Sequence, residues 1–181
     1  MRNEIYIGTI CLEKNRWAKG KTPTYRVSDW RDRFAEAGFD GMELWENHAA
    51  LADADEVRRL AVAEPCPVKI FNSYVNLAPD GSARRRESAE FARSLRAEGL
   101  KWNFGSRRGD TRPETAMARE WFSQFGPAVR LLCECHPGTW VETPEVAARA
   151  LAGFDDPRVG VIVHAFEDME TEHHIRDWFR H

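Results

Sequence analysis

Residues 129–151 read VRLLCECHPGTWVETPEVAARAL, and this stretch contains one complete strand-then-helix unit. The apolar run over 129–135 predicts a buried β-strand, which ends at the His-Pro-Gly sequence that follows it. Thr143 is a typical helix N-cap and Pro144 a typical first helical residue, with Val146, Ala150 and Leu151 spaced to face a core. The stretch therefore predicts a β-strand followed closely by an α-helix.

The same pattern recurs along the chain. Further short apolar or β-branched runs lie near Ile5 to Cys11, Gly41 to Trp45, Val68 to Tyr74, Leu100 to Phe104 and Val159 to Ala165. The starts of successive runs are roughly 30 residues apart, which is about the length of one βα repeat. Parallel neighbouring strands need a crossover that a helix usually supplies. We therefore predict an α/β fold with a parallel sheet, of the (β/α) TIM-barrel type.

Helical periodicity occupies the segments between these runs. The expected helices lie around Val27–Ala37, Asp53–Ala61, Glu87–Leu95, Ala116–Phe125 and Ile175–Phe179, in addition to the one that begins at Thr143. Asp53 is the expected N-cap of the second of these helices, and Gly38 is the expected C-cap of the first.

A flavodoxin-like open sheet is the main alternative. It is less favoured because TICLEKNRW, residues 9–17, follows the first strand where a glycine-rich phosphate loop would be expected. A full barrel needs roughly 240 to 250 residues, whereas this chain has 181. We therefore expect a single domain over residues 1–181 that is an incomplete TIM barrel, with about six βα units and without the last ones.

Composition narrows the class of protein. The formal charge of −3 gives no global reason to expect a nucleic-acid or anionic-membrane partner. The four cysteines form no CxxC pair, which favours reduced thiols. The N-terminal MRNEIYIGTI does not resemble a signal peptide, and no window is apolar enough to span a membrane. We expect a soluble cytoplasmic protein that binds a small neutral or anionic ligand.

Polar and ionisable residues follow nearly every predicted strand, which in a barrel is where catalytic groups lie. On the fifth strand, alternation places Leu132, Glu134 and His136 on one face. A buried carboxylate needs compensation, so Glu134 is a candidate metal ligand or catalytic acid/base. The alternative is a structural ion pair of Glu134 with Lys101 or Arg130. His136 is either a second ligand or a residue that caps the loop after the strand.

The other candidates come from the remaining strand ends. His164 ends the sixth strand and is either a ligand or a core histidine. The candidate substrate-binding residues, each with a solvated or structural role as the alternative, are Glu43, Trp45, His48, Asn72, Asn103 and Arg107.

Five stretches carry a resemblance to a known family. GFDGMELWENH, VKIFNSYVNL, LKWNFG, LLCECHPGTWVETPEVA and VGVIVHAF resemble the successive strand ends of the xylose isomerase-like TIM-barrel superfamily, which includes sugar phosphate isomerases and epimerases. The resemblance extends over most of the chain, and ECHPGT followed by the TPE helix start is its most specific part.

The resemblance implies a metal-dependent isomerase or epimerase that transfers a proton next to a carbonyl of a sugar or polyol. The metal would be Mn²⁺, Mg²⁺, Co²⁺ or Zn²⁺, with Glu134 as ligand and acid/base. His164 stands where the family usually has an aspartate ligand. The family's ligands on strands seven and eight have no counterpart here, because the sequence ends first.

Three interpretations therefore stay open. The chain is an enzyme completed by another subunit, which predicts a homo-oligomer, or a part of a longer enzyme, or a non-catalytic scaffold that binds a small polar ligand. DNA repair in the manner of endonuclease IV, a more distant relative of the same superfamily, would need more strand-end histidines and a basic groove.

Overall fold

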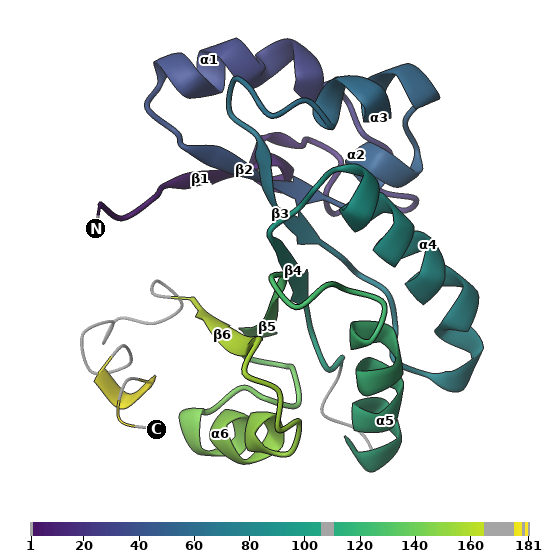
Figure 1. The fold of residues 1–181 in the computed structure, drawn as a ribbon, viewed down its shortest axis with the longest axis vertical. Coiled ribbons are helices and arrows are strands. Elements are labelled where there is room, and N and C mark those ends of the chain that lie inside the picture. The colour runs from purple at the N-terminus through teal and green to yellow at the C-terminus, as the bar shows by residue number, and fades with distance from the viewer. Residues whose placement is uncertain (1, 106–110, 165–175, 179, 181) are drawn as a thin grey trace. The chain divides into compact units, whose positions relative to one another are not determined.

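The computed structural model describes residues 2–105, 111–164, 176–178 and 180 (Figure 1). Six strands alternate with helices along these residues. The chain divides into two compact units. Unit 1 comprises Met1–Ser73 and Glu87–Leu100, and unit 2 comprises Tyr74–Arg86 and Lys101–His181.

Unit 1 is built on three parallel strands, β1 (Tyr6–Gly8), β2 (Gly41–Trp45) and β3 (Val68–Asn72). β2 pairs with β1 on one side and with β3 on the other. In a flavodoxin-like sheet the first strand, not the second, would lie between its neighbours. The strand order in unit 1 therefore excludes the flavodoxin-like alternative and is the order that a barrel requires.

Short helices connect these strands. The elements are η1 (Thr9–Leu12), η2 (Val27–Trp30), α1 (Arg31–Glu36), α2 (Asn47–Ala50) and α3 (Ala54–Leu60). Asp53 caps α3 as predicted, since its carboxylate accepts a hydrogen bond from the Glu56 backbone N–H at 2.8 Å. Gly38 follows α1 with a φ of +89°, the left-handed conformation expected of a C-cap glycine. α1 and α3 lie on one side of β2 (Figure 1).

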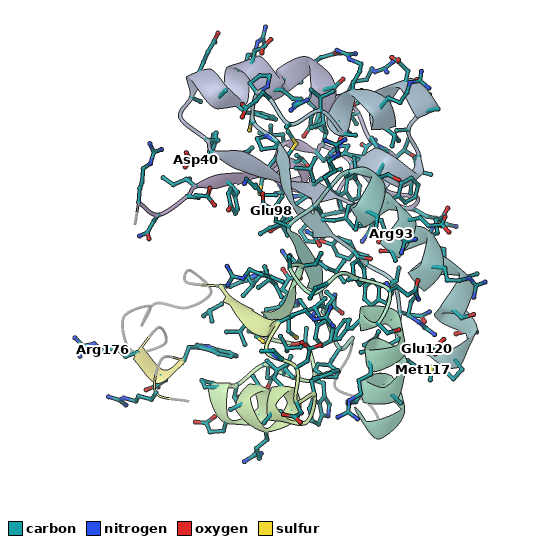
Figure 2. The ribbon with its side chains drawn as sticks, viewed as in Figure 1. Asp40, Arg93, Glu98, Met117, Glu120 and Arg176 are labelled. Carbon is teal, nitrogen blue, oxygen red and sulfur yellow. The ribbon has the colours of Figure 1, made fainter. Side chains whose placement is uncertain are left out.

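Two ion pairs join neighbouring segments of unit 1 at its surface (Figure 2). The Asp40 carboxylate, just before β2, accepts hydrogen bonds from the Ile5 backbone N–H and from Arg2. Lys69 on β3 donates to the exposed carboxylate of Glu98 at 2.6 Å. Exposed pairs of this kind contribute at most about 1 kcal/mol each, so burial of apolar side chains supplies most of the stability. The buried side chains include Val27, Phe34, Met42, Leu44, Leu60, Val68 and Phe71.

Unit 2 contains η3 (Pro79–Gly81), α5 (Thr111–Phe122), β5 (Arg130–Cys135), α6 (Pro144–Ala152) and β6 (Val159–Val163). Two further elements, α4 (Ser82–Ser94) and β4 (Gly99–Trp102), have residues in both units. β5 and β6 pair in parallel, with Glu134 opposite Ile162. An aromatic cluster fills the core, where Trp102 packs edge-on against Phe122 and Phe154 at 5.0 and 5.7 Å between ring centroids.

All six predicted strands are present, although most are shorter than expected. The helix predicted at Thr143 begins at Pro144 with Thr143 as its N-cap, but the Thr143 side chain makes no capping hydrogen bond. Of the helix expected at 175–179, residues 176–178 are helical and the rest lies outside the described residues. The fold is an incomplete TIM barrel with six parallel strands. Among the described residues, no helix combines the length and the apolar composition that crossing a bilayer requires.

Candidate functional site

Glu134 lies near the end of β5 and is the centre of a charged cluster in unit 2. Its Oε1 atom is 2.7 Å from the Lys101 ammonium on β4 and 2.9 Å from Nε2 of His164. Because Glu134 pairs with Ile162 in parallel register, alternation along β6 brings His164, two residues farther on, to the same face of the sheet. Glu134 and Lys101 are both buried.

His136 completes this group, which we call the Glu134 cluster: Lys101, Glu134, His136 and His164. The His136 ring stacks on the His164 ring with 5.6 Å between centroids and 23° between planes. Its Nδ1 lies 2.8 Å from the carbonyl oxygen of Pro137, which assigns the ring proton to that nitrogen. The His136 carbonyl accepts a hydrogen bond from the Thr139 hydroxyl at 2.7 Å, so the residue also holds the loop after β5. Both roles considered for His136 are thus compatible with its position.

The electrostatics of the cluster favour an ionised Glu134. Burial by itself would raise the pKa of this carboxyl group. The Lys101 charge and hydrogen bond outweigh burial, and with His164 and His136 they lower the pKa of Glu134 below its usual value. Glu134 is therefore a carboxylate at neutral pH, and it is paired with Lys101, one of the two structural partners expected from the sequence.

A second carboxylate and histidine pair lies in unit 1. Nε2 of His48, in α2, is 2.7 Å from the Glu13 carboxylate, and Nδ1 is 3.0 Å from the Thr9 hydroxyl. Thr24 donates to the same carboxylate through its backbone N–H and its hydroxyl. We call Thr9, Glu13, Thr24 and His48 the Glu13 cluster. The Glu13 and His48 side chains are 0% and 1% exposed, so this pair is sealed from solvent.

The hydrogen bonds around the Glu13 cluster suit a neutral His48. The Trp45 backbone N–H donates to the Thr9 hydroxyl oxygen at 2.9 Å, and the hydroxyl proton can be donated to Nδ1 of His48. Nε2–H then donates to Glu13, as in a neutral imidazole. Burial lowers the pKa of His48 despite the opposing effect of Glu13, in agreement with this neutral form.

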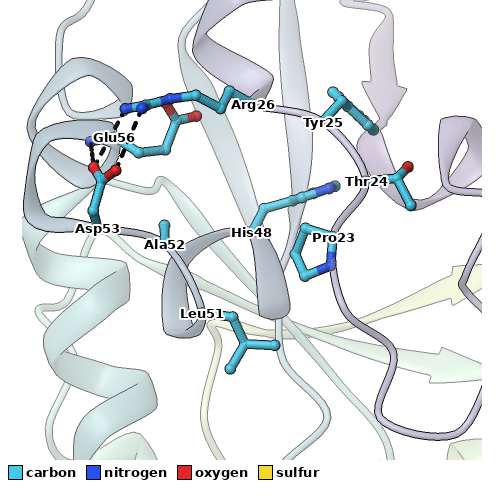
Figure 3. Close-up of a pocket in the computed structure, with 9 residues that line it drawn as sticks. All are labelled: Pro23, Thr24, Tyr25, Arg26, His48, Leu51, Ala52, Asp53 and Glu56. Atoms are coloured by element: carbon cyan, nitrogen blue, oxygen red, sulfur yellow. Dashed lines mark hydrogen bonds and ion pairs between the residues drawn. The ribbon is translucent and has the colours of Figure 1, made fainter.

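A pocket of about 330 Å³ opens beside the Glu13 cluster (Figure 3). His48 and Tyr25 contribute to its lining, but the Tyr25 hydroxyl already donates to the Thr9 carbonyl at 2.7 Å. Arg26 lines the opposite part and pairs with Asp53 and Glu56. Arg26 thus offsets part of the negative charge at this pocket, and the arrangement holds Arg26 against the start of α3.

The remaining predicted substrate-binding residues each make separate contacts. Glu43 and Asn72, on neighbouring strands, join through an amide-to-carboxylate hydrogen bond of 2.7 Å. Trp45 is 1% exposed and packs edge-on against His48. Asn103 accepts a hydrogen bond from the Gly105 N–H and so shapes the turn after β4. Arg107 lies outside the described residues.

The described residues do not fit a divalent-metal site as they stand. No three of their histidine, cysteine, aspartate or glutamate side chains form a group that could hold a metal ion. At the predicted site, Glu134 and His164 are in contact, but the oxygen that His164 approaches is also bound by the Lys101 ammonium. A metal would have to share that oxygen with a cation.

Sequence reasoning missed the role of Glu13. This residue lies in the segment after β1, which drew attention only because it lacks a glycine-rich loop. Its partner His48 is 35 residues away, so no local pattern connects the two. The only signal in the sequence was the position of a polar residue shortly after a predicted strand. Of this pair, that signal led to a prediction for His48 but not for Glu13.

No protein-family model matches the sequence, and no curated protein matches it either. Solved structures do match. The probable 3-DHS dehydratase AsbF of Bacillus anthracis aligns over 94% of this chain and 66% of its own, with a TM-score of 0.71 and 16% identity. The IOLI protein with a bound zinc atom aligns over 93% and 67%, with a TM-score of 0.64 and 13% identity. A xylose isomerase-like TIM-barrel protein of Mycobacterium smegmatis, in complex with magnesium, aligns over 87% and 63%, with a TM-score of 0.61 and 16% identity.

These likenesses establish the fold. The chain shares the architecture of xylose isomerase-like TIM-barrel proteins, as the sequence resemblance predicted. It spans 66% of the length of the AsbF structure. Two of the similar structures contain zinc or magnesium, so proteins of this fold bind divalent metals.

Proposed function

We propose that this protein transfers a proton next to a carbonyl group of a small sugar or polyol, as in a sugar isomerase or epimerase, with Glu134 as the acid/base. One observation carries the proposal. A buried, ionised carboxylate stands at the carboxyl end of a parallel strand, where barrel enzymes place catalytic groups. The similar structures, which include a probable dehydratase, are compatible with this class of reaction.

The two oxygens of Glu134 would have different tasks. Lys101 and His164 both bind Oε1, and no other described residue bonds the carboxylate. Oε1 would therefore orient the group, while Oε2 would take the proton from the carbon next to the carbonyl. A general base must lie within hydrogen-bonding reach of the proton that it removes, and a fixed carboxylate meets this condition more readily than a mobile one.

Removal of the proton leaves negative charge on the substrate as an enediolate. The Lys101 ammonium and the His164 imidazole are the groups beside Glu134 that can stabilise this charge. Return of the proton by Glu134 to the neighbouring carbon, together with transfer of the hydroxyl proton to the former carbonyl oxygen, would complete an isomerisation. An epimerisation would need, in addition, a proton donor on the opposite face of the carbon. Exclusion of water by the bound substrate would raise the proton affinity of Glu134 during the reaction.

Divalent-metal dependence, which the resemblance implied, remains a prediction. A bound metal would polarise the substrate carbonyl. Because the described donors do not form such a site, each step above uses only side chains of this chain. The metal identity among Mn²⁺, Mg²⁺, Co²⁺ and Zn²⁺ stays open to titration.

The test is exchange of substrate hydrogen with solvent. The wild-type protein and Glu134→Gln are each incubated in D₂O with a panel of ketoses and keto-polyols, with and without Mn²⁺, and followed by proton NMR. We expect deuterium at the carbon next to the carbonyl for at least one wild-type substrate, and a loss of about 10²- to 10⁴-fold in the variant. Glu98→Gln, at an exposed ion pair, is the matched control. Equal exchange in Glu134→Gln would refute the proposed role.

A non-catalytic scaffold is the second candidate. Its support is the Lys101–Glu134 ion pair itself, which resembles a structural pair inside a sheet. This candidate predicts saturable binding of a small polar ligand, seen by saturation-transfer NMR, with no hydrogen exchange in any panel member. If instead a second copy completes the site, light scattering would show a homo-oligomer, and exchange would fall when the protein is diluted below its dissociation constant.

A further inference from the structure

The position that the sequence resemblance assigns to a divalent cation is occupied by an ammonium group of the chain itself. We propose that Lys101 replaces the metal as the cation at Glu134, so that the wild-type chain binds divalent ions weakly at this site. The inference rests on the proposed function only in taking Glu134 as the centre of the site. Lys101 is then a positioning residue that determines what else the carboxylate can bind.

The geometry of the pair supports this substitution. Nζ of Lys101 is 2.7 Å from Oε1 of Glu134, and both side chains are 10% exposed. Among the described residues, the pair thus combines one buried positive charge with one buried negative charge. The same ammonium keeps the carboxylate ionised, which is the task that a metal would otherwise perform.

A divalent ion would compete directly with Lys101. Carboxylate oxygens bind zinc at about 2.0 to 2.2 Å, so an ion on Oε1 would lie only a few ångströms from the ammonium. A divalent ion and an ammonium only a few ångströms apart repel each other strongly in a partly buried site. Binding of a metal to Oε1 therefore requires Lys101 to leave its position.

Lys101 has little freedom to leave. The next residue on β4, Trp102, is 1% exposed and packs edge-on against Phe104 at 4.9 Å, as well as against Phe122 and Phe154. This packing fixes the backbone from which Lys101 extends. The lysine is thus anchored in the unit 2 core next to its partner, unlike a flexible surface lysine.

Removal of the ammonium should free a usable set of donors. Glu134 and His164 are already in contact, and the His136 ring is stacked on His164. A carboxylate and an imidazole are both donors that zinc accepts, so Glu134 and His164 would supply two of its ligands. Lys101→Met keeps most of the length of the side chain and removes only the charge and the donor.

The experiment is calorimetric titration of metal-stripped protein with Zn²⁺ and, separately, Mn²⁺. We expect Lys101→Met to bind Zn²⁺ roughly tenfold or more tightly than the wild type, because one buried charge repulsion is gone. Adding Glu134→Gln to Lys101→Met should abolish that gain and so assign it to this site. Lys69→Met removes a lysine from the exposed pair with Glu98 and should leave Zn²⁺ affinity unchanged.

A second measurement needs only the wild-type chain. Its melting temperature should be the same in EDTA and in excess Mn²⁺, since Lys101 already supplies the cation. A rise with Mn²⁺ that Glu134→Gln abolishes would overturn the inference, as would equal Zn²⁺ affinity of the wild type and Lys101→Met. Neither readout depends on turnover, so failure of the proposed reaction and failure of this inference are separately visible.

Discussion

Among the described residues, a carboxylate is paired with a histidine in each of the two units, and the two pairs differ in what surrounds them. In unit 1, Glu13 and His48 are 0% and 1% exposed, and hydroxyl and backbone donors complete their bonding. In unit 2, Glu134 and His164 are 10% and 33% exposed, and the third member is an ammonium. The same pair of residue types is sealed in one place and accessible in the other.

This difference in exposure distinguishes a pair that stabilises the fold from a pair that can take part in a reaction. A sealed pair whose polar atoms are all satisfied holds segments together and offers no atom to a ligand. A partly accessible pair, with its charge balanced by a lysine, keeps an oxygen for proton transfer. A buried histidine beside a carboxylate is therefore not by itself a sign of an active site. What distinguishes an active-site pair from a structural one is its exposure to solvent and the identity of the third group bonded to it.

The largest effect should come from the sealed pair. Glu13→Gln places an amide N–H₂ among the donors of Thr24 and His48, so at least one donor loses its acceptor. We expect a loss of about 3 kcal/mol in the free energy of unfolding, since each orphaned buried group costs about 1 to 3 kcal/mol. Urea denaturation measures it. Glu134→Gln keeps an acceptor for Lys101 and His164 but leaves the ammonium without its counter-charge, so it should lose about 2 kcal/mol, less than Glu13→Gln because this pair is partly accessible to water; equal losses would remove the distinction.

A smaller effect should appear in the pH dependence of stability. The folded pKa of His48 is below its usual 6.5, so the unfolded chain takes up a proton first as the pH falls. The contribution of neutral His48 is therefore complete above pH 6.5 and is lost as the pH falls toward the folded pKa. The loss is at most about 1.4 kcal/mol per pH unit for one proton.

Urea midpoints between pH 5 and 7.5, measured for the wild type and for His48→Gln, test this effect. The variant should be less stable but should lose the part of the slope that His48 causes. Glu13 and Glu134 also have lowered pKa values, but their contributions decline only below about pH 4.5, the usual value for a glutamate. An unchanged slope in His48→Gln would show that His48 is not held neutral.

The smallest effect is expected at the surface. Glu98→Gln breaks an exposed ion pair with Lys69 (Figure 2) and should change the free energy of unfolding by less than about 1 kcal/mol. Urea denaturation in low and high salt is the measurement. A loss as large as that of Glu13→Gln would mean that burial does not distinguish these carboxylates.

Local patterns were sufficient to predict the strands and the helix starts that carry a clear cap, whereas α4 and α5 begin at Ser82 and Thr111, before the expected Glu87 and Ala116. The run at Gly41–Trp45 gave a strand with those bounds, and Asp53 and Thr143-Pro144 gave the starts of α3 and α6. Alternation placed Glu134 and His136 on one face, and parallel pairing of β5 with β6 then brought His164 to Glu134. These features follow from the alternation of side chains along a strand and from the pairing of strands that are consecutive in the chain. Both can be predicted from the sequence.

The hydrogen-bond and ion-pair partners of the two buried glutamates could not be predicted in the same way. Lys101 and Arg130 were equally available as partners of Glu134, and only β4 in its folded position selects Lys101. The pairing of Glu13 with His48 depends on the path of the segment after β1, where no repeat or capping pattern applies. Such contacts arise from tertiary packing between segments far apart in the sequence.

The most direct test of this account applies one chemical change to both pairs. Glu134→Gln and Glu13→Gln each replace a carboxylate with its amide. Both variants are assayed for deuterium exchange into a substrate that the wild type exchanges. The temperature is one at which circular dichroism shows both variants to be folded. The account predicts a loss of about 10²- to 10⁴-fold for Glu134→Gln and near wild-type exchange for folded Glu13→Gln. Retained exchange in Glu134→Gln, or an equal loss in both, would contradict it.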